Sequence, residues 1–261
     1  MAFQLHTVDG VKFYTSQALD GVTHAFSTRV GGVSRPPFDS LNLGSSEYDD
    51  KNDIMQNYTL FTSAAGIDPE SLVFTKQVHG DTVNAAEPRH RGNGFKYPSV
   101  WECDALITDC EGLALTVFWA DCIPILLYDP EARAIGAVHA GWRGTASANV
   151  IKAAAEMVKR YGCENIRAAI GPGIGACCFE TRYDVVKAMR SVFGELPEYI
   201  VHSGGGRYNI DLKGINAWLL RRAGIAYIDV SPLCTCCLDE EFFSHRRMGP
   251  MRGIQAAVIT L

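Results

Sequence analysis

The amino-acid sequence predicts an α/β fold in which mixed sheets and helices form layers. Short apolar runs bounded by turn residues recur through the middle of the chain, and such runs are typical of buried strands. Other segments repeat apolar residues at the spacing of one helix face. The predicted strands and helices do not alternate strictly, so the βαβ order of a doubly wound parallel sheet is not favoured.

The first part of the chain predicts a hairpin, a strand and a helix. Alternating residues flank Asp9-Gly10, a turn pair that tolerates positive φ, so an antiparallel strand is expected on either side. Another strand is expected at residues 24–28, before a glycine-rich turn at residues 31–34. A helix is expected over residues 53–65, because Gly66 is a residue that can end it.

The rest of the chain predicts strands in the middle and a mixture of helices and strands after them. The middle strands are expected at residues 72–74, 105–107, 113–118, 123–128 and 135–138. A helix is expected over residues 145–161, with Gly162 as its C-terminal cap and an apolar face of Val150, Ile151, Ala154, Val158 and Tyr161. Later helices are expected at 183–192 and 215–223, and later strands at 168–170, 227–230 and 256–259.

Composition is typical of a globular protein without a nucleic-acid or membrane partner. The formal net charge of −5 gives no general attraction to nucleic acid or acidic lipid. No stretch approaches the ~20 apolar residues of a membrane span, and the N-terminus does not resemble a signal peptide. The nine cysteines are an odd number in a long chain, which favours reduced thiols and a cytoplasmic protein. The loose segment 87–99 has motifs on both sides of it, so residues 1–261 are expected to form a single domain. The protein is expected to be a monomer or a small homo-oligomer.

Three segments place a possible metal ligand in a turn beside an apolar run. The ligands are His79, Cys122 and His139, and each has a glycine, aspartate or arginine nearby. Two imidazoles and one thiolate suit Zn²⁺ and leave a fourth position open for water, as in catalytic rather than structural zinc sites. The wide gaps between the ligands exclude a zinc-finger knuckle, so a folded scaffold must bring them together. From spacing alone, packed core residues remain the commoner interpretation of such a set.

The other cysteines allow a second interpretation. Cys234 and Cys237 have C-x-x-C spacing, and Cys177-Cys178 is a vicinal pair. Because no histidine cluster or second C-x-x-C accompanies them, buried thiols are favoured over a second zinc site.

Several polar groups near these segments are candidates for substrate contacts. Arg143 lies in a Gly-Trp-Arg-Gly turn that is expected to open a helix, a place where phosphate or carboxylate can bind. Asp104 and Asp121 are candidate proton shuttles or supports for the metal ligands. The glycine-rich stretch 171–175 does not have Rossmann spacing and is expected to be a tight loop on the substrate side, whereas 204–206 is expected to be a flexible turn.

Motifs spread over almost the whole chain resemble the polyphenol oxidoreductase, or laccase-domain, family, whose members are also described as purine nucleoside phosphorylases and as a bacterial peptidoglycan-editing factor. The most specific string is Val138-His139-Ala140-Gly141-Trp142-Arg143-Gly144. The other matching stretches are 26–29, 31–34, 40–44, 77–80, 103–108, 120–124, 170–172, 177–178 and 242–247. The sequence departs from the family at Gly173, where cysteine is usual, at Ala176, where proline is usual, and at Met251-Arg252-Gly253, where a Gly-Arg pair is usual.

The resemblance implies a four-layer α/β/β/α sandwich and a metal held by His79, Cys122 and His139. It also implies zinc-dependent phosphorolysis of inosine, adenosine, guanosine and methylthioadenosine, deamination of adenosine, and a link to peptidoglycan editing. On this basis the catalytic set is expected to be the three ligands with Arg143 and Asp121. Substrate and phosphate contacts are expected from Arg29, Asn42, Gln77, Asp104, Arg143 and Arg246.

Two other functions remain open at the level of sequence. Two histidines and a cysteine are also the ligands of a blue-copper site, although none of the seven histidines forms the His-x-His pair of multicopper oxidases. Alternatively, Cys122 could be a nucleophile with His139 as its base, in a hydrolase of cell-wall precursor amides. The sequence lacks the H-x-E and P-C-x-x-C signature that usually accompanies deaminase activity.

Overall fold

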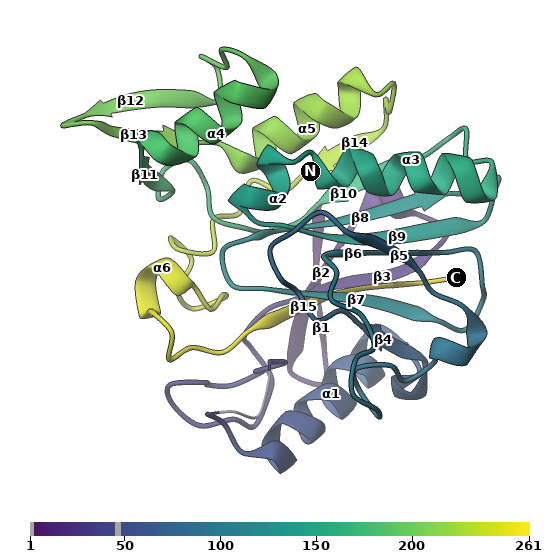
Figure 1. Ribbon diagram of the computed structural model, residues 1–261. Helices are drawn as coiled ribbons and strands as arrows, with labels where there is room; N and C mark the ends of the chain where they lie inside the picture. Colours follow the sequence, from purple (N-terminus) through teal and green to yellow (C-terminus); the bar gives the residue numbers. More distant parts are fainter. Residues whose placement is uncertain (1–2, 45–47) are drawn as a thin grey trace.

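The computed structural model describes residues 3–44 and 48–261 and confirms a mixed-sheet α/β fold. It has four layers (Figure 1). Helix α1 (Lys51–Ala65) covers one six-stranded sheet, which packs on a second six-stranded sheet. The outer face of the second sheet is covered by the helices α2 (Trp142–Ala146), α3 (Asn149–Tyr161) and α5 (Leu212–Arg222), and α4 (Tyr183–Phe193) packs against α2.

The first sheet has the strand order β1-β2-β3-β15-β7-β4. Its members are β1 (Phe3–Val8), β2 (Val11–Ser16), β3 (Thr23–Ser27), β15 (Gln255–Thr260), β7 (Ala114–Trp119) and β4 (Leu72–Phe74). The predicted hairpin is confirmed, since β1 and β2 pair through a turn in which Asp9 and Gly10 both have positive φ. All pairs are antiparallel except β4 with β7.

The second sheet has the strand order β14-β10-β8-β9-β6-β5. Its members are β14 (Ile228–Val230), β10 (Arg167–Ile170), β8 (Ile123–Asp129), β9 (Ala134–Ala140), β6 (Ala105–Thr108) and β5 (Val83–Ala85). Every residue of β8 and β9 is buried, because one face meets the first sheet and the other meets the helices. This burial on both faces explains why these strands were visible as continuous apolar runs.

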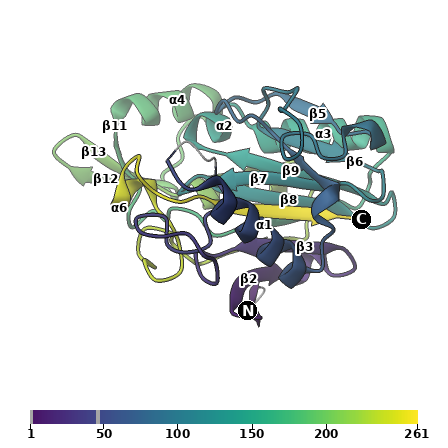
Figure 2. The same cartoon turned by 90° about the horizontal axis from the view of Figure 1, so that it is seen from below.

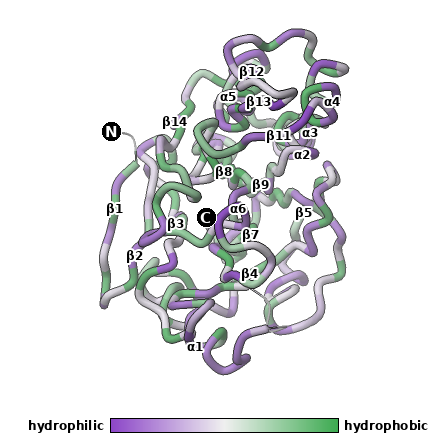
Figure 3. Tube along the Cα trace, turned by 90° about the vertical axis from the view of Figure 1, so that its left-hand side faces the viewer, coloured by the Kyte–Doolittle hydropathy of each residue, from purple (hydrophilic) through white to green (hydrophobic). Residues whose placement is uncertain are grey.

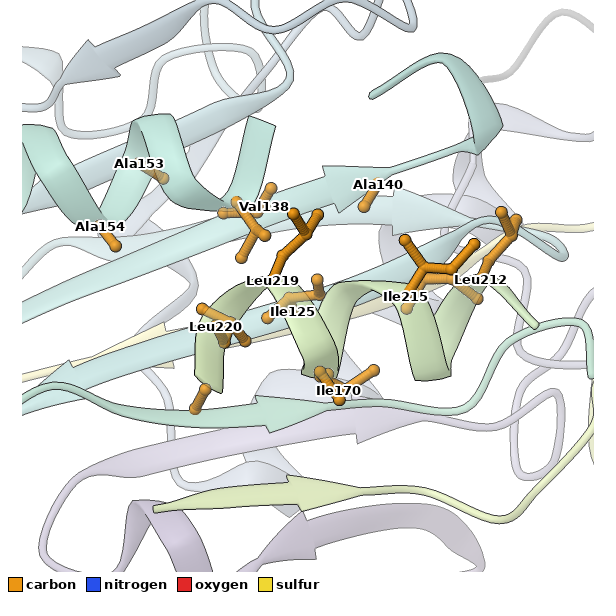
Figure 4. Close-up of a cluster of buried hydrophobic side chains, with 14 of the residues drawn as sticks. Ile125, Val138, Ala140, Ala153, Ala154, Ile170, Leu212, Ile215, Leu219 and Leu220 are labelled. Atoms are coloured by element: carbon orange, nitrogen blue, oxygen red, sulfur yellow. The ribbon is translucent and has the colours of Figure 1, made fainter. Parts of the chain in front are cut away.

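Three apolar clusters hold the layers together. One lies between the two sheets, where Figure 3 shows much of the hydrophobic colour around β3, β7 and β8. The second lies between the outer helices and the second sheet, with Leu212, Ile215 and Leu219 of α5 facing the strands (Figure 4). The third lies under α1, which crosses the first sheet in the view of Figure 2.

Helix α1 has the ends that its sequence predicts. The Asp50 side chain accepts hydrogen bonds from the N–H groups of Asn52 and Asp53, so the helix begins two residues before the predicted start. Gly66 ends it in the left-handed conformation. At 15 residues α1 is the longest helix in the described part of the chain, and none of the helices there is long and apolar enough to span a bilayer.

The helix predicted over residues 145–161 is wrong in two respects. The chain forms two helices instead, α2 and α3, because Ala148 between them has left-handed geometry with φ 54°. The buried face of α3 includes Ala153 and Met157, whereas Val158, which was expected on that face, is 51% exposed. Asn149 is the residue that breaks the pattern, since its buried amide donates to the carbonyl of His139 at 2.9 Å.

A third, small sheet and a short helix were not predicted. The sheet is formed by β11 (Glu180–Arg182), β13 (Arg207–Ile210) and β12 (Ile200–Gly204), and the helix is α6 (His245–Met248). Their residues are largely exposed, so they lack the apolar periodicity that predicts an element. The predicted turn at 204–206 is confirmed as the tip of the β12–β13 hairpin, where all three glycines have positive φ.

Candidate metal centre

The fold brings His79, Cys122 and His139 together. His79 lies in the loop after β4, Cys122 in the turn between β7 and β8, and His139 near the end of β9. Strands β8 and β9 are antiparallel neighbours, with Ile123 opposite Ala140, so Cys122 lies beside the end of β9. The possible ligand atoms of the three side chains all lie within 4.8 Å of one another, and this cluster can hold a metal ion.

The buried Asp104 orients His139. Its Oδ1 atom lies 2.8 Å from Nδ1 of the imidazole, which leaves the other ring nitrogen for the cluster. A carboxylate behind a ligating histidine sets the tautomer and the ring orientation. The contact with Asp104 therefore gives His139 the support that a metal-ligating histidine usually has.

The same carboxylate also holds the loop that carries His79. Its oxygens accept hydrogen bonds from the backbone N–H groups of Val78, His79 and Gly80, at 3.2, 3.0 and 2.7 Å. These bonds support positive φ at His79, where φ is 58°. Asp104 is fully buried and is not among the residues that line the adjoining cavity, so its place is behind two ligands rather than against a substrate.

Charge in the cluster favours a thiolate. Burial raises the pKa of Cys122, but the neighbouring His139 and His79 outweigh it and lower the pKa to about 6. For His139, burial lowers the pKa, but the Cys122 thiolate and Asp104 raise it to about 9. The protein without metal thus holds an ion pair, in which the sulfur is already in the form that binds a metal.

Gly141 leaves space for the ligands to meet. A Cβ atom at this position would lie 3.1 Å from Sγ of Cys122 and 3.2 Å from Cδ2 of His79. Both contacts are closer than side chains ordinarily allow. Gly141, two residues after His139, is therefore part of the site.

A cavity of about 430 Å³ opens beside the cluster. The three ligands line one part of it. The remaining walls are formed by Gln77, Phe118, Trp119, Ala120, Asp121, Trp142, Arg143, Ile174, Phe179, Leu212, His245, Arg246, Arg252 and Ile254. Aromatic and aliphatic walls with a few charged groups are typical of a site for a small organic molecule.

Three arginines line this cavity, and they differ in how many of their side-chain N–H groups already donate to other protein groups. Arg143 is exposed and stacks over the Trp142 ring at 4.2 Å, without a side-chain hydrogen bond to another described residue. Arg246 donates to the carbonyls of Cys178 and Glu180 at 2.8 and 3.1 Å. Arg252 is partly buried; its Nη1 donates to the carbonyl of Pro250 at 3.2 Å, and its Nε–H has no partner among the described residues. Arg143 and Arg252 therefore have donors available for a ligand.

Arg252 lies where the sequence departs from the family pattern. Its position in the motif is shifted relative to the family, yet its side chain lies in the cavity. The next residue, Gly253, packs against the Phe243 ring so closely that a Cβ would lie 2.4 Å from Cζ. The signal available in the sequence was the Arg-Gly pair itself, since only glycine fits there.

Asp121 and Gln77 line the cavity but already have protein partners. The Asp121 carboxylate accepts hydrogen bonds from the Thr235 hydroxyl at 2.7 Å and from the Arg246 backbone N–H at 2.6 Å. The Gln77 amide exchanges two hydrogen bonds with the backbone of Phe118, at 2.8 and 2.7 Å. Both side chains hold the walls of the cavity in place.

The structure does not bring Arg29 and Asn42 to this cavity. Arg29 forms an ion pair with Asp39 at 3.0 Å and lies in a separate depression. The Asn42 amide is buried, and its oxygen accepts from the backbone N–H of Ile254 at 2.9 Å. These two predicted substrate contacts are therefore separated from the metal cluster.

The predicted burial of the remaining cysteine group is wrong. Cys177 and Cys237 are exposed, Cys178 is half-buried, and only Cys234 of the four is buried. Their sulfur atoms nevertheless lie together, in the second cluster of possible metal ligands within the described residues.

The donor set allows more than one metal. Two imidazoles and one thiolate are ligand types that zinc binds, and they are also the ligands of a blue-copper centre. A blue-copper centre adds a weak axial ligand, usually methionine or sometimes glutamine; none of the described residues that line the cavity is a methionine, and the Gln77 amide is already bonded to Phe118. The cluster therefore suits a single ion with an open coordination position.

A family model and several named proteins match this chain over most of its length. The family model described as "Multi-copper polyphenol oxidoreductase laccase" matches residues 23–261. The purine nucleoside phosphorylase of Deinococcus radiodurans is 38% identical over 242 residues, which cover 92% of this chain and 89% of that protein. Purine nucleoside phosphorylase YlmD of Geobacillus stearothermophilus is 36% identical over 250 residues, with 92% and 90% coverage.

Solved structures agree with the sequence comparisons. The crystal structure of YlmD from Geobacillus stearothermophilus has a TM-score of 0.93 at 34% identity and covers 99% of this chain and 98% of its own. The hypothetical protein YfiH of Bacillus licheniformis has a TM-score of 0.90 at 32% identity and covers 98% of each chain.

Proposed function

Because this chain belongs to the multi-copper polyphenol oxidoreductase laccase family, and its relatives are named purine nucleoside phosphorylases, we propose that it is a zinc-dependent purine nucleoside phosphorylase. The observation that carries the proposal is the cavity in which a metal-ligand cluster, aromatic walls and available arginine donors meet. Inosine, adenosine, guanosine and methylthioadenosine are the proposed nucleosides.

The walls of the cavity suit a purine. Phe118, Trp119, Trp142 and Phe179 give flat apolar surfaces on which a base can stack. The Trp119 indole N–H is buried without a partner among the described residues, so it can donate to an acceptor on the base or sugar. A volume of about 430 Å³ is within the range of small-molecule sites.

Phosphate is proposed to bind at Arg143, with Arg252 as a second donor. A guanidinium matches two phosphate oxygens at once, and Arg143 is held in orientation by its stacking on Trp142. In phosphorolysis a phosphate oxygen forms a bond to the ribose C1′ while the bond from C1′ to the purine N9 breaks. The electron pair of that bond leaves with the purine, which takes up a proton.

The metal ligands contribute to the site through their arrangement. When bound, a zinc ion supplies Lewis-acid stabilisation of negative charge on an oxygen atom of the substrate. Cys122 and the two histidines would hold it, Asp104 keeps the His139 ring in position, and Gly141 leaves access. Adenosine deamination and a part in peptidoglycan editing stay predictions from the family resemblance.

Arg143→Ala is expected to lower kcat/KM for phosphorolysis of inosine about 10- to 100-fold. The loss follows from hydrogen bonds to a charged group, each worth about 1.5–3 kcal/mol. The measurement is initial-rate kinetics with phosphate varied at saturating inosine, in which the KM for phosphate should rise.

The matched control is Arg160→Ala, because Arg160 is exposed at the far end of α3 and, among the described residues, pairs only with Glu156. Arg143→Lys should recover part of the loss, since it restores the charge but not the planar fork. Unchanged phosphate dependence in Arg143→Ala would rule out this phosphate site. Product analysis with and without phosphate separates phosphorolysis from deamination in the same assay.

A second candidate function is favoured by one contact. Cys122, His139 and Asp104 also form the chain of groups found in cysteine hydrolases, in which a thiolate is paired with an imidazole oriented by a carboxylate. Bound metal would occupy the sulfur and prevent its use as a nucleophile. The two functions therefore differ in the reactivity of Cys122 when metal is present.

Alkylation of Cys122 by iodoacetamide is expected to be blocked in zinc-loaded protein and rapid after chelation. In the chelated protein the rate should stay high as the pH falls from 8 to about 7, and then decrease around pH 6. The reason is the lowered pKa of about 6, since the reactive thiolate is lost only as the pH falls through it. Peptide mass spectrometry would locate the label, and equal labelling with and without zinc would favour the hydrolase.

A further inference from the structure

Four cysteines outside the cavity come from two loops that begin at neighbouring strand ends. Strands β10 and β14 are parallel, so the loops that follow them leave the sheet at the same edge. The first loop carries Cys177 and Cys178, and the second carries Cys234 and Cys237. A bridge between Gly173 and Cys234 continues the pairing beyond the strands. The topology therefore places the vicinal pair against the C-x-x-C pair.

The four sulfur atoms have the spacing of ligands around one ion. The Cys237 sulfur lies 3.3 Å from that of Cys178 and 3.6 Å from that of Cys177, and all four lie within 4.8 Å of one another. Sulfur atoms at about 2.3 Å from a tetrahedral zinc ion are about 3.8 Å apart. A polynuclear iron–sulfur cluster would separate its ligands further, because the cluster stands between them.

The backbone around these cysteines is shaped for thiolates. The N–H of Gly175 donates to the Cys234 sulfur at 3.1 Å. A Cβ atom at Gly175 would lie 3.1 Å from the Cys177 sulfur and 3.3 Å from Cβ of Cys234, which is tighter than most side-chain contacts, so glycine favours this close approach of the loops. The Cys237 N–H donates to the carbonyl of Cys234 at 3.2 Å, which makes the C-x-x-C segment a tight turn.

Cationic side chains surround the two loops. Arg247 donates to the carbonyls of Thr235 and Cys236 at 2.8 and 2.9 Å. Lys213, which is buried, donates to the carbonyls of Ser231 and Leu233 at 2.8 and 2.9 Å. Four thiolates around a divalent ion carry a net negative charge, and these cations would offset it.

We propose that Cys177, Cys178, Cys234 and Cys237 bind a second zinc ion in a closed, four-thiolate structural site. Binding releases the thiol protons to solvent and leaves no coordination position for water. The site is separate from the cluster of His79, Cys122 and His139, and it does not depend on the proposed phosphorylase activity.

The second ion would fix one wall of the cavity. Ile174 and Phe179 of the first loop line that wall, and Arg246 is held there by the carbonyl of Cys178. From the second loop, Thr235 donates to Asp121, which also accepts from the Arg246 backbone. A metal that joins the two loops would therefore hold Asp121 and Arg246 in a fixed position relative to the cluster of His79, Cys122 and His139.

The test is the metal content of the full chain, purified in the presence of a phosphine reductant and loaded with zinc. Wild type is expected to retain two zinc ions per chain, as measured by elemental mass spectrometry. Cys237→Ser and His139→Ala should each lose one ion, and the double variant should lose both. Cys236→Ser is the matched control, because Cys236 lies between the proposed ligands but outside the cluster; it should keep both ions.

Cobalt substitution gives a second readout that does not depend on activity. A four-thiolate cobalt site has intense visible bands, which should persist in His139→Ala and disappear in Cys237→Ser. The proposal is overturned if wild type retains one ion and His139→Ala none, or if Cys237→Ser keeps the wild-type content and spectrum. Iron at this site, or a disulfide between these cysteines in the freshly purified, reduced protein, would overturn it equally.

Discussion

His139→Ala is expected to remove the ion from the cluster of His79, Cys122 and His139 and to lower nucleoside turnover by more than about 100-fold. Even groups that only orient a metal ligand cost about 10- to 100-fold when they are removed, so loss of a ligand should cost more. Its removal would leave two ligands and an Asp104 carboxylate without its imidazole partner. Metal content and phosphorolysis of inosine, measured on the same sample, should fall together.

The control must separate loss of the site from loss of the fold. His139 is buried, so its replacement opens a space in the protein, whereas His79 is an exposed ligand. His79→Ala should therefore give the same loss of metal and turnover with less change in the melting temperature. His202→Ala, on the exposed strand β12, should change neither property. Full turnover in metal-depleted His79→Ala would show that the reaction does not use this centre.

Asp104→Asn is expected to weaken metal binding about 10- to 100-fold and to destabilise the fold as well. The carboxylate accepts from the His139 ring and from three backbone N–H groups, and an amide can supply only one oxygen for these four contacts. Each buried donor left without a partner costs about 1–3 kcal/mol. Zinc affinity by competition with a chelating dye, together with urea unfolding of metal-free protein, measures the two effects separately.

The pH dependence of this variant should also differ from that of wild type. Burial raises the pKa of Asp104, but His139 and the N–H groups of Gly80 and Val78 outweigh it and hold the pKa below its ordinary value. The stability from this carboxylate is thus present above the pKa of an unfolded aspartate and is lost as the pH falls through the lower, folded value. Asp104→Asn should lack that acid-dependent loss. The exposed Glu102→Gln is the control, and a loss of metal affinity there as large as in Asp104→Asn would contradict the assigned role.

The predicted elements were most accurate where an apolar run or a cap gives a local signal. Strand β4 has its predicted bounds, and α1 ends at Gly66 as expected. The prediction failed where a polar contact overrides periodicity, as at Ala148 and Asn149, which divide one predicted helix into α2 and α3. It also missed the exposed hairpin of β12 and β13, since exposed strands carry no apolar pattern.

The sequence by itself predicted the three candidate ligands of the metal cluster, through the family motifs, and the mixed-sheet fold. Both depend on local patterns: the residues around His139 form a specific motif, and buried strands are written as apolar runs. Only the tertiary structure decided what surrounds the ligands. It placed Asp104 behind His139, 35 residues away in the chain, directed Arg252 into the cavity, and left Arg29 and Asn42 outside it. It also joined two cysteine pairs that lie about 60 residues apart. The physical reason is that these contacts depend on sheet register and on which strand ends share an edge, and neither is encoded in the spacing of residues along the chain.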